Sequence, residues 1–246
     1  MNAYRIILFL FIINTSGVSI AQEKSLSKNE ILLLTGQGTP TLYGQGYDLI
    51  KEAADAYIKM KVAAAKDGFE LKVVSSYRSF DRQLAIWNRK FEINSKEGMD
   101  PLENIKKITE YSTIPGTSRH HWGTEIDLIS AQPKVDGDVL LANLFEGEGP
   151  YAALKSWMDA NANSYGFFLA YPKDSLRKGF QYEPWHYSYL PTSKKYLEWY
   201  LNLELESILK DKNILGKEYF TEEFMQHYLE EYILGISPEL LFQKKE

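Results

Sequence analysis

The chain has 246 residues, a formal net charge of −5 and no cysteine. This length is compatible with one domain, because single domains reach about 200 to 250 residues. The acidic balance argues against a nucleic-acid partner, which requires a basic face. Without cysteine there are no disulfides, so the fold must be stabilised by its apolar core.

The first 21 residues have the pattern of a secretory signal peptide. Arg5 precedes the apolar run 6–13, and small residues stand before the expected cleavage site after Ala21. The alternative, a transmembrane anchor, needs about 20 apolar residues, and this run is much shorter. We expect an exported protein without a stable membrane anchor, in the periplasm or cell envelope, since no wall-sorting or repeat module follows.

The next segments are predicted to be a loop, a helix and a strand. Glycines and a proline punctuate residues 22–46, which indicates a loop. Residues 50–65 are alanine-rich with helical periodicity. Residues 69–74 alternate like a half-buried strand, and this strand leads into Tyr77-Arg78-Ser79.

Two further helices are predicted over residues 81–91 and 101–111, with a loop over 94–100 between them. The apolar residues of the first recur at helical spacing, which favours a packed face over a cofactor site. Residues 151–160 have helical character as well, and residues 167–171 resemble a buried strand. The segments 193–209 and 221–234 are helical in period and are expected to serve packing.

Two short segments contain three of the four histidines. The first, Ser-Arg-His-His-Trp-Gly-Thr-Glu-Ile-Asp at 118–127, is predicted to be a loop followed by a strand over 124–129, where alternation places Glu125 and Asp127 on one face. The second, Glu-Pro-Trp-His at 183–186, lies in a predicted strand over 182–189. Because alternation would separate Glu183 from His186, we expect Pro184 to mark a bulge or a strand start.

These residues have the chemistry of a hydrolytic zinc site. Catalytic zinc usually has three ligands drawn from histidine and carboxylate, with water in the fourth position, and His120, Asp127 and His186 fit that set. Glu183 is placed to accept a proton from the water. His121 should face away from His120, either to support the ligand residues or to pack in the core. His227, on a predicted terminal helix, should face solvent.

Three patterns together resemble a known family. Ser-x-His-x(6)-Asp at 118–127, Glu-x-x-His at 183–186 and Tyr-Arg-Ser-x(3)-Gln at 77–83 are similar to the motifs of VanY-type D-alanyl-D-alanine carboxypeptidases, which are zinc peptidases related to lysostaphin and hedgehog folds. The similarity covers about residues 75–189. It implies an α+β fold in which a central antiparallel sheet carries the metal on one face and helices surround it.

The resemblance also implies roles for individual residues. It implies one zinc ion per chain, bound by His120, Asp127 and His186. Glu183 would be the general base and Arg78 the active-site arginine. Gln83 and Ser118 would line the substrate cleft. The implied reaction removes the terminal D-alanine of peptidoglycan stem peptides. We expect a monomer with one domain over residues 22–246, comprising a core of about 45–192 and a helical extension over 193–246.

One position departs from the family pattern. Where the family usually has a small alanine two residues before the ligand aspartate, this chain has Glu125. Its carboxylate could serve a structural hydrogen bond, since buried carboxylates need partners. It could also pair with Arg78, or narrow the cleft and alter the substrate.

Alternatives remain at the level of the sequence. Arg78 could form only a surface ion pair, and Gln83 could bind a peptide carbonyl or only cap a turn. A non-haem iron oxygenase also uses two histidines and a carboxylate, but with a closer first pair. A wall-binding module would not need Glu183. An L,D-carboxypeptidase, a D-Ala-D-Ala dipeptidase or a peptidoglycan endopeptidase would share the same zinc centre.

Overall fold

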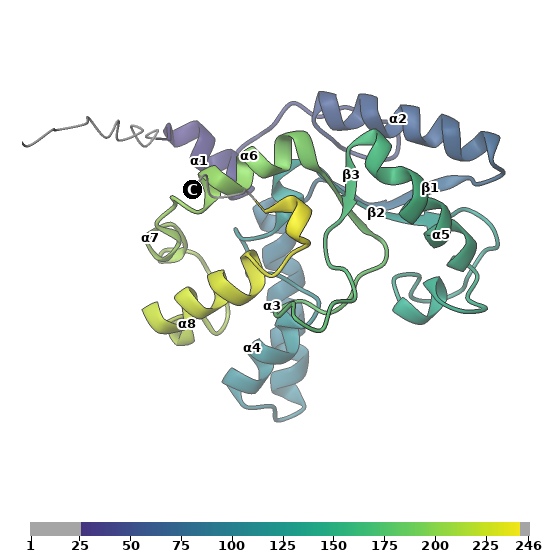
Figure 1. Ribbon diagram of the computed structural model, residues 1–246. Helices are drawn as coiled ribbons and strands as arrows, with labels where there is room; N and C mark the ends of the chain where they lie inside the picture. The colour runs from purple at the N-terminus through teal and green to yellow at the C-terminus, as the bar shows by residue number, and fades with distance from the viewer. Residues whose placement is uncertain (1–25, 242–246) are drawn as a thin grey trace, which may run out of the picture.

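The computed structural model describes residues 26–241 (Figure 1). The signal peptide expected over residues 1–21 lies outside the described residues. Within 26–241, none of the helices combines the length and apolar character that a membrane crossing requires.

A four-stranded antiparallel sheet lies at the centre of the molecule, which confirms the predicted α+β class. Its spatial order is β1 (Leu71–Ser75), β2 (Glu125–Ser130), β4 (His186–Tyr189) and β3 (Phe167–Leu169). In the register of the two central strands, Asp127 is directly opposite His186 and Glu125 is opposite Ser188. Direct partners in an antiparallel pair carry side chains on the same face, so all four lie on one side of the sheet.

The other face of the sheet is apolar and is covered by two helices. Helices α2 (Lys51–Lys66) and α5 (Ala152–Asn161) pack on it, and its core includes Ile126, Leu128 and Tyr187. The period-two alternation of β2 thus separates a packed face from a polar one, as the sequence predicts. In Figure 1, α3 (Phe80–Lys96) and α4 (Pro101–Thr109) lie on the opposite side of the sheet from α2.

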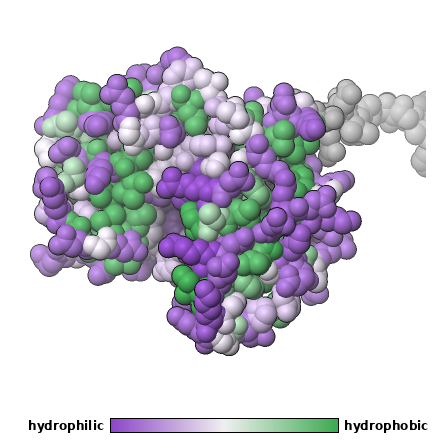
Figure 2. All heavy atoms as spheres, turned by 180° about the vertical axis from the view of Figure 1, so that it is seen from behind, coloured by the Kyte–Doolittle hydropathy of each residue, from purple (hydrophilic) through white to green (hydrophobic). Residues whose placement is uncertain are grey.

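The C-terminal segment packs against α3 and α4 in a second core. It contains α6 (Leu190–Tyr200), α7 (Leu205–Leu209) and α8 (Glu222–Tyr228), followed by a π-helical turn over Leu229–Ile233. Buried residues of this cluster include Trp87, Ile105, Leu197 and Leu240. Seen from behind, the surface mixes hydrophilic and hydrophobic residues and is hollowed between two parts of the molecule (Figure 2).

Several predicted boundaries are corrected by the structure. The loop predicted over 22–46 contains helix α1 (Lys28–Leu34), which begins at a capping box formed by Ser27 and Glu30. Helix α3 continues past residue 91 to Lys96, because its first breaker is Gly98.

Three further segments also differ from the prediction. The strand predicted over 182–189 begins only at His186, after a turn. The helix predicted over 193–209 is interrupted between α6 and α7, and residues Arg119–Trp122 form a 3-10 turn rather than an extended loop.

Candidate active site

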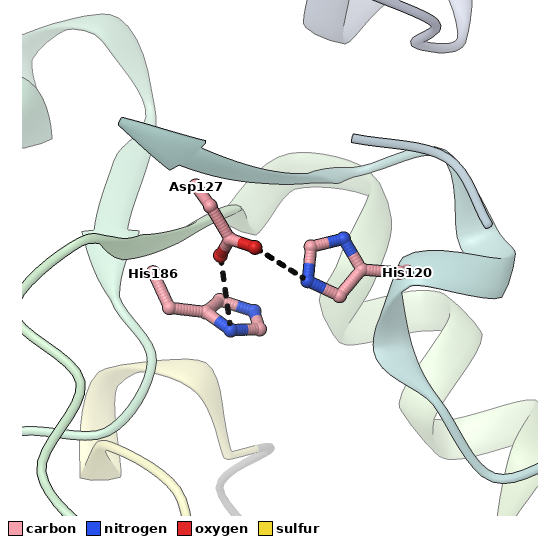
Figure 3. Close-up of side chains that lie close together, drawn as sticks. All are labelled: His120, Asp127 and His186. Carbon is pink, nitrogen blue, oxygen red and sulfur yellow. Dashed lines mark ion pairs between the residues drawn. The ribbon is translucent and has the colours of Figure 1, made fainter. Parts of the chain in front are cut away.

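Three buried side chains with metal-ligand chemistry meet on the polar face of the sheet. His120 comes from the 3-10 turn η1 (Arg119–Trp122), Asp127 from β2, and His186 from the first position of β4. Ligand atoms of the three all lie within 4.8 Å of one another. His120 Nε2 is 3.5 Å from Asp127 Oδ2, and His186 Nδ1 is 3.6 Å from Asp127 Oδ1 (Figure 3). Asp127 and His186 come together because they are directly opposite each other on the neighbouring strands β2 and β4.

Each histidine is oriented by a hydrogen bond from its other ring nitrogen. His120 Nδ1 lies 2.7 Å from the carbonyl of Ser76, and His186 Nε2 lies 3.0 Å from Glu125 Oε2. Both partners accept hydrogen bonds, so the outer nitrogen of each ring carries a proton, and the inner nitrogen of each ring faces Asp127. Metal-binding histidines generally show this arrangement.

The donor set fits a divalent cation. Asp127 Oδ1 is buried and has no hydrogen-bond partner among the described residues, although buried carboxylate oxygens are normally paired. Two imidazole nitrogens and one carboxylate are a set from which catalytic zinc sites are built, with a position left for water. The three side chains can therefore hold a metal such as zinc.

Glu183 lies beside this group, just before β4. The Glu183 carbonyl accepts a hydrogen bond from His186 N–H at 3.2 Å, which closes a turn over residues 183–186. The turn, rather than strand alternation, brings both side chains to one side, and Glu183 Oε2 lies 3.0 Å from His186 Nδ1. Pro184 thus lies in this turn, two residues before the start of β4, and not in a bulge or at the first position of the strand.

The charges of the group shift its pKa values. Burial lowers the pKa of His186, but hydrogen bonds to Glu125 and Glu183 and the charge of Asp127 outweigh it and raise the pKa to about 10. Burial raises the pKa of Asp127, yet the neighbouring His120 and His186 bring it below its ordinary value. Burial lowers the pKa of His120. The ionised Asp127 and the neutral His120 match what a metal ligand set requires, whereas His186 has to lose the proton on its inner nitrogen when a metal binds.

A cleft of about 470 Å³ opens over the three side chains. Its lining combines charged, polar and aromatic residues from distant parts of the chain: Arg78, Lys90, Tyr111, Ser112, Thr113, Ser118, Arg119, His120, Asp127, Asp138, Leu140, Leu141, Ala142, Tyr171, Phe180, Glu183, Trp185 and His186. Such a cavity with a few convergent polar groups is typical of a small-molecule or peptide site.

Arg78 follows β1 and faces this cleft. Its guanidinium donates to Gln83 Oε1 at 2.7 Å from Nη1 and to Ser75 Oγ at 3.2 Å from Nη2. Burial lowers its pKa, and the charges of Asp127 and Glu183 oppose that effect. The structure thus places Arg78 in the cleft with the three metal-ligand candidates, rather than in a surface ion pair.

Of the two residues expected to line the cleft, Ser118 does and Gln83 does not. Ser118 is in the lining, and its hydroxyl accepts from His120 N–H at 3.3 Å, which caps the turn. Gln83 is fully buried behind Arg78 and is not in the lining. Its amide donates to the Thr113 carbonyl at 2.7 Å, and its oxygen accepts from Arg78. Gln83 supports the arginine, which requires contacts that the sequence motif does not reveal.

Glu125 is completely buried and has a structural set of hydrogen bonds, not a contact with Arg78. Its partner is Arg119, whose Nε and Nη2 lie 3.3 Å from the two carboxylate oxygens. Burial raises its pKa, but Arg119, His186 and Ser188 outweigh burial and lower the pKa to about 2. Sequence reasoning missed Arg119; the available signal was that a buried carboxylate on this strand needs a basic partner.

The two other histidines lie outside the group, as expected. His121 is buried, with Nδ1 2.6 Å from the Arg78 carbonyl and Nε2 accepting from Gly116 N–H at 3.1 Å. His227 lies on α8 with a side chain that is 60% exposed, and forms an ion pair with Glu231. Sequence reasoning also missed Tyr171, whose ring packs edge-on against His186 with centroids 4.9 Å apart.

Two histidines and an aspartate on the polar face of an antiparallel sheet form a donor set of the kind found in catalytic zinc centres. A family model described as VanY, D-alanyl-D-alanine carboxypeptidase, matches residues 46–192. The chain belongs to this family.

Individual proteins are similar to this chain over part of their length. The chain is 32% identical over 172 residues to YodJ of Bacillus subtilis (strain 168), covering 69% of this chain and 52% of that protein. It is 28% identical over 215 residues to a D-alanyl-D-alanine carboxypeptidase of Enterococcus faecium, covering 87% of this chain and 54% of the relative. The chain thus spans about half the length of the curated relatives it matches. A solved structure of VanYB with D-alanine-D-alanine is similar at a TM-score of 0.49 with 22% identity, over 72% of this chain and 92% of the other.

Proposed function

We propose that the protein is a zinc-dependent D-alanyl-D-alanine carboxypeptidase that removes the terminal D-alanine of peptidoglycan stem peptides. The observation that carries the proposal is the unpaired, buried Asp127 Oδ1, which faces His186 Nδ1 at the floor of the cleft beside Glu183. His120, Asp127 and His186 would hold one zinc ion. The family match supports the substrate.

The bound zinc would supply Lewis acidity, which lowers the pKa of water and polarises the scissile carbonyl. Glu183 accepts the proton of the attacking water, because its carboxylate lies at the ligand group without belonging to it. Arg78 donates hydrogen bonds to the oxygen of the scissile carbonyl as negative charge develops on it. Glu183 then gives the proton to the leaving amine of D-alanine.

The test compares two muropeptides in the presence and absence of a chelator. We expect the zinc-loaded protein to remove one alanine from a pentapeptide and to leave the corresponding tetrapeptide intact, with products identified by mass. Chelation should stop the reaction. Cleavage of the tetrapeptide alone would instead establish an L,D-carboxypeptidase, and cleavage of neither would refute the carboxypeptidase proposal.

A substitution separates the proposed base from the proposed ligands. Glu183→Gln should lower kcat by about 10² to 10⁴, the usual contribution of a general base, while the zinc content stays at one per chain. His227→Gln is a matched control, since His227 is exposed on α8. If Glu183→Gln kept wild-type activity, the assignment of the base would be wrong.

We also propose that the protein acts outside the cytoplasm, in the periplasm or cell envelope. The support is the apolar run 6–13 and the small residues around Ala21. N-terminal sequencing of the protein purified from its native cells should begin at Gln22. An intact N-terminus in the cytoplasmic fraction would refute this.

A further inference from the structure

Glu125 has an unusual position for a buried carboxylate. It is fully buried on β2, two residues before Asp127, and its two oxygens accept five hydrogen bonds within the described part of the chain. Four of these come from Arg119, Thr124 and Ser188. The fifth comes from His186 Nε2 at 3.0 Å, so the carboxylate reaches the metal-ligand group through the ring of His186.

The outer nitrogens of the two histidines therefore have different partners. His120 donates to a neutral backbone carbonyl, whereas His186 donates to an ionised carboxylate. Hydrogen bonds to an ionised acceptor are roughly twice as strong as those to a neutral one. A carboxylate behind a ligating imidazole fixes the ring orientation and increases the basicity of the inner nitrogen.

The carboxylate is itself immobilised. Ser188 donates to Glu125 Oε1 at 2.7 Å from the directly opposite position on β4, and Arg119 binds both carboxylate oxygens. Arg119 is held in turn by Ser188 Oγ at 2.7 Å and by the Trp122 ring, whose centroid lies 4.7 Å from its guanidinium carbon. The position of Glu125 Oε2 is thus determined by contacts on two strands and on η1.

We propose that Glu125 is a positioning residue of the metal centre. It holds His186 through Nε2–H, so that Nδ1 is presented to the metal beside Asp127, and Arg119 holds Glu125 in place. This inference rests on the proposed zinc centre. It assigns to Glu125 a function beyond a local structural hydrogen bond, and it predicts that metal affinity depends on a residue that does not touch the metal.

The test measures zinc affinity by competition with a chelator of known affinity. Glu125→Gln should weaken zinc binding by about 10- to 100-fold, the usual loss when a partner behind a ligating histidine is changed. Because Glu125→Gln leaves Arg119 buried without its counter-charge, the variant could fail to fold. The double variant Arg119→Met/Glu125→Ala removes both charges, and it should show the same loss of zinc affinity.

Thr124→Val is the matched control. It removes a hydrogen bond of 2.9 Å to the same carboxylate but leaves the contact with His186. We expect it to lower stability while keeping zinc affinity within about threefold, since the partner of the ligating ring is unchanged. Equal losses of zinc affinity in Thr124→Val and the double variant would indicate a general structural effect and overturn the proposal.

A spectroscopic measurement gives an answer that does not depend on activity. In the zinc-loaded wild type, ¹H–¹⁵N correlation of the His186 ring should place the proton on Nε2 with a downfield shift typical of a carboxylate acceptor. The double variant should lose that downfield shift. A wild-type proton on Nδ1, or unchanged zinc affinity in both Glu125 variants, would overturn the inference even if the D,D-carboxypeptidase activity were confirmed. Failure to cleave muropeptides with these zinc results intact would refute only the proposed function.

Discussion

His121 is expected to make the metal-free protein sensitive to mild acid. Its ring is neutral, with the proton on Nδ1 for the Arg78 carbonyl and with Nε2 accepting from Gly116 N–H. A second proton would have to stand on Nε2, where it would face that N–H. Burial is the main cause that lowers the pKa of His121, from 6.5 to about 3.

The sign and size of the effect follow from linkage. Because the folded-state pKa lies below the unfolded value of 6.5, the unfolded chain binds more protons, and stability present above pH 6.5 is lost as the pH falls toward about 3. At about 1.4 kcal/mol per pKa unit, the full loss is about 5 kcal/mol. Between pH 7 and pH 5 it is about 2 kcal/mol.

The assay is urea unfolding of the chelated protein at pH 7 and pH 5. His121→Gln keeps a polar side chain that cannot be protonated, so its free energy of unfolding should fall by about 2 kcal/mol less than that of the wild type over this range. His227→Gln, at a mostly exposed side chain on α8, is the matched control for the substitution itself. Equal losses in wild type and His121→Gln would refute the reasoning.

Two predictions concern Arg78 and its support. Arg78→Lys keeps the charge but loses the planar guanidinium with its paired donors, so kcat/KM should fall by about 10²- to 10³-fold while zinc affinity stays unchanged. Steady-state kinetics measures kcat/KM, and chelator competition measures zinc affinity. A loss of kcat/KM below tenfold would contradict the oxyanion role. Gln83→Met preserves volume but removes the acceptor of Arg78 and the donor to the Thr113 carbonyl, so kcat should fall about tenfold or more and the free energy of unfolding by about 1 to 3 kcal/mol. Lower stability with unchanged kcat would show that Gln83 only fills space.

The sequence predicts those parts of the site that depend on local periodicity and spacing. Alternation along β2 predicts that Glu125 and Asp127 share a face, and the structure confirms it. Alanine-rich periodicity likewise predicts α2. Helix α1 was not predicted, because the glycines and Pro40 that follow it indicate a loop. The capping box of Ser27 and Glu30 was a signal for its start.

The contacts that support the site depend on distant segments and could not be predicted. Gln83 binds Arg78 from the next helix and Thr113 from a later loop. Arg119 pairs with Glu125 only because η1 folds back over β2, and both contact Ser188 on β4. The periodicity of a single segment cannot predict a contact among residues from three separate segments.

The C-terminal helices have a consequence for how the chain can be divided. The family match ends at residue 192, but Tyr200 on α6 donates to the Gly116 carbonyl at 2.9 Å. Tyr228 on α8 accepts from Ile114 N–H at 3.2 Å and lies 2.9 Å from the Thr117 hydroxyl. Both tyrosines thus hold the loop that leads into Ser118 and His120. The end of the family match is therefore not a boundary at which the chain can be cut: the C-terminal helices hold the loop that carries His120, and a chain ending at residue 192 would lose these contacts.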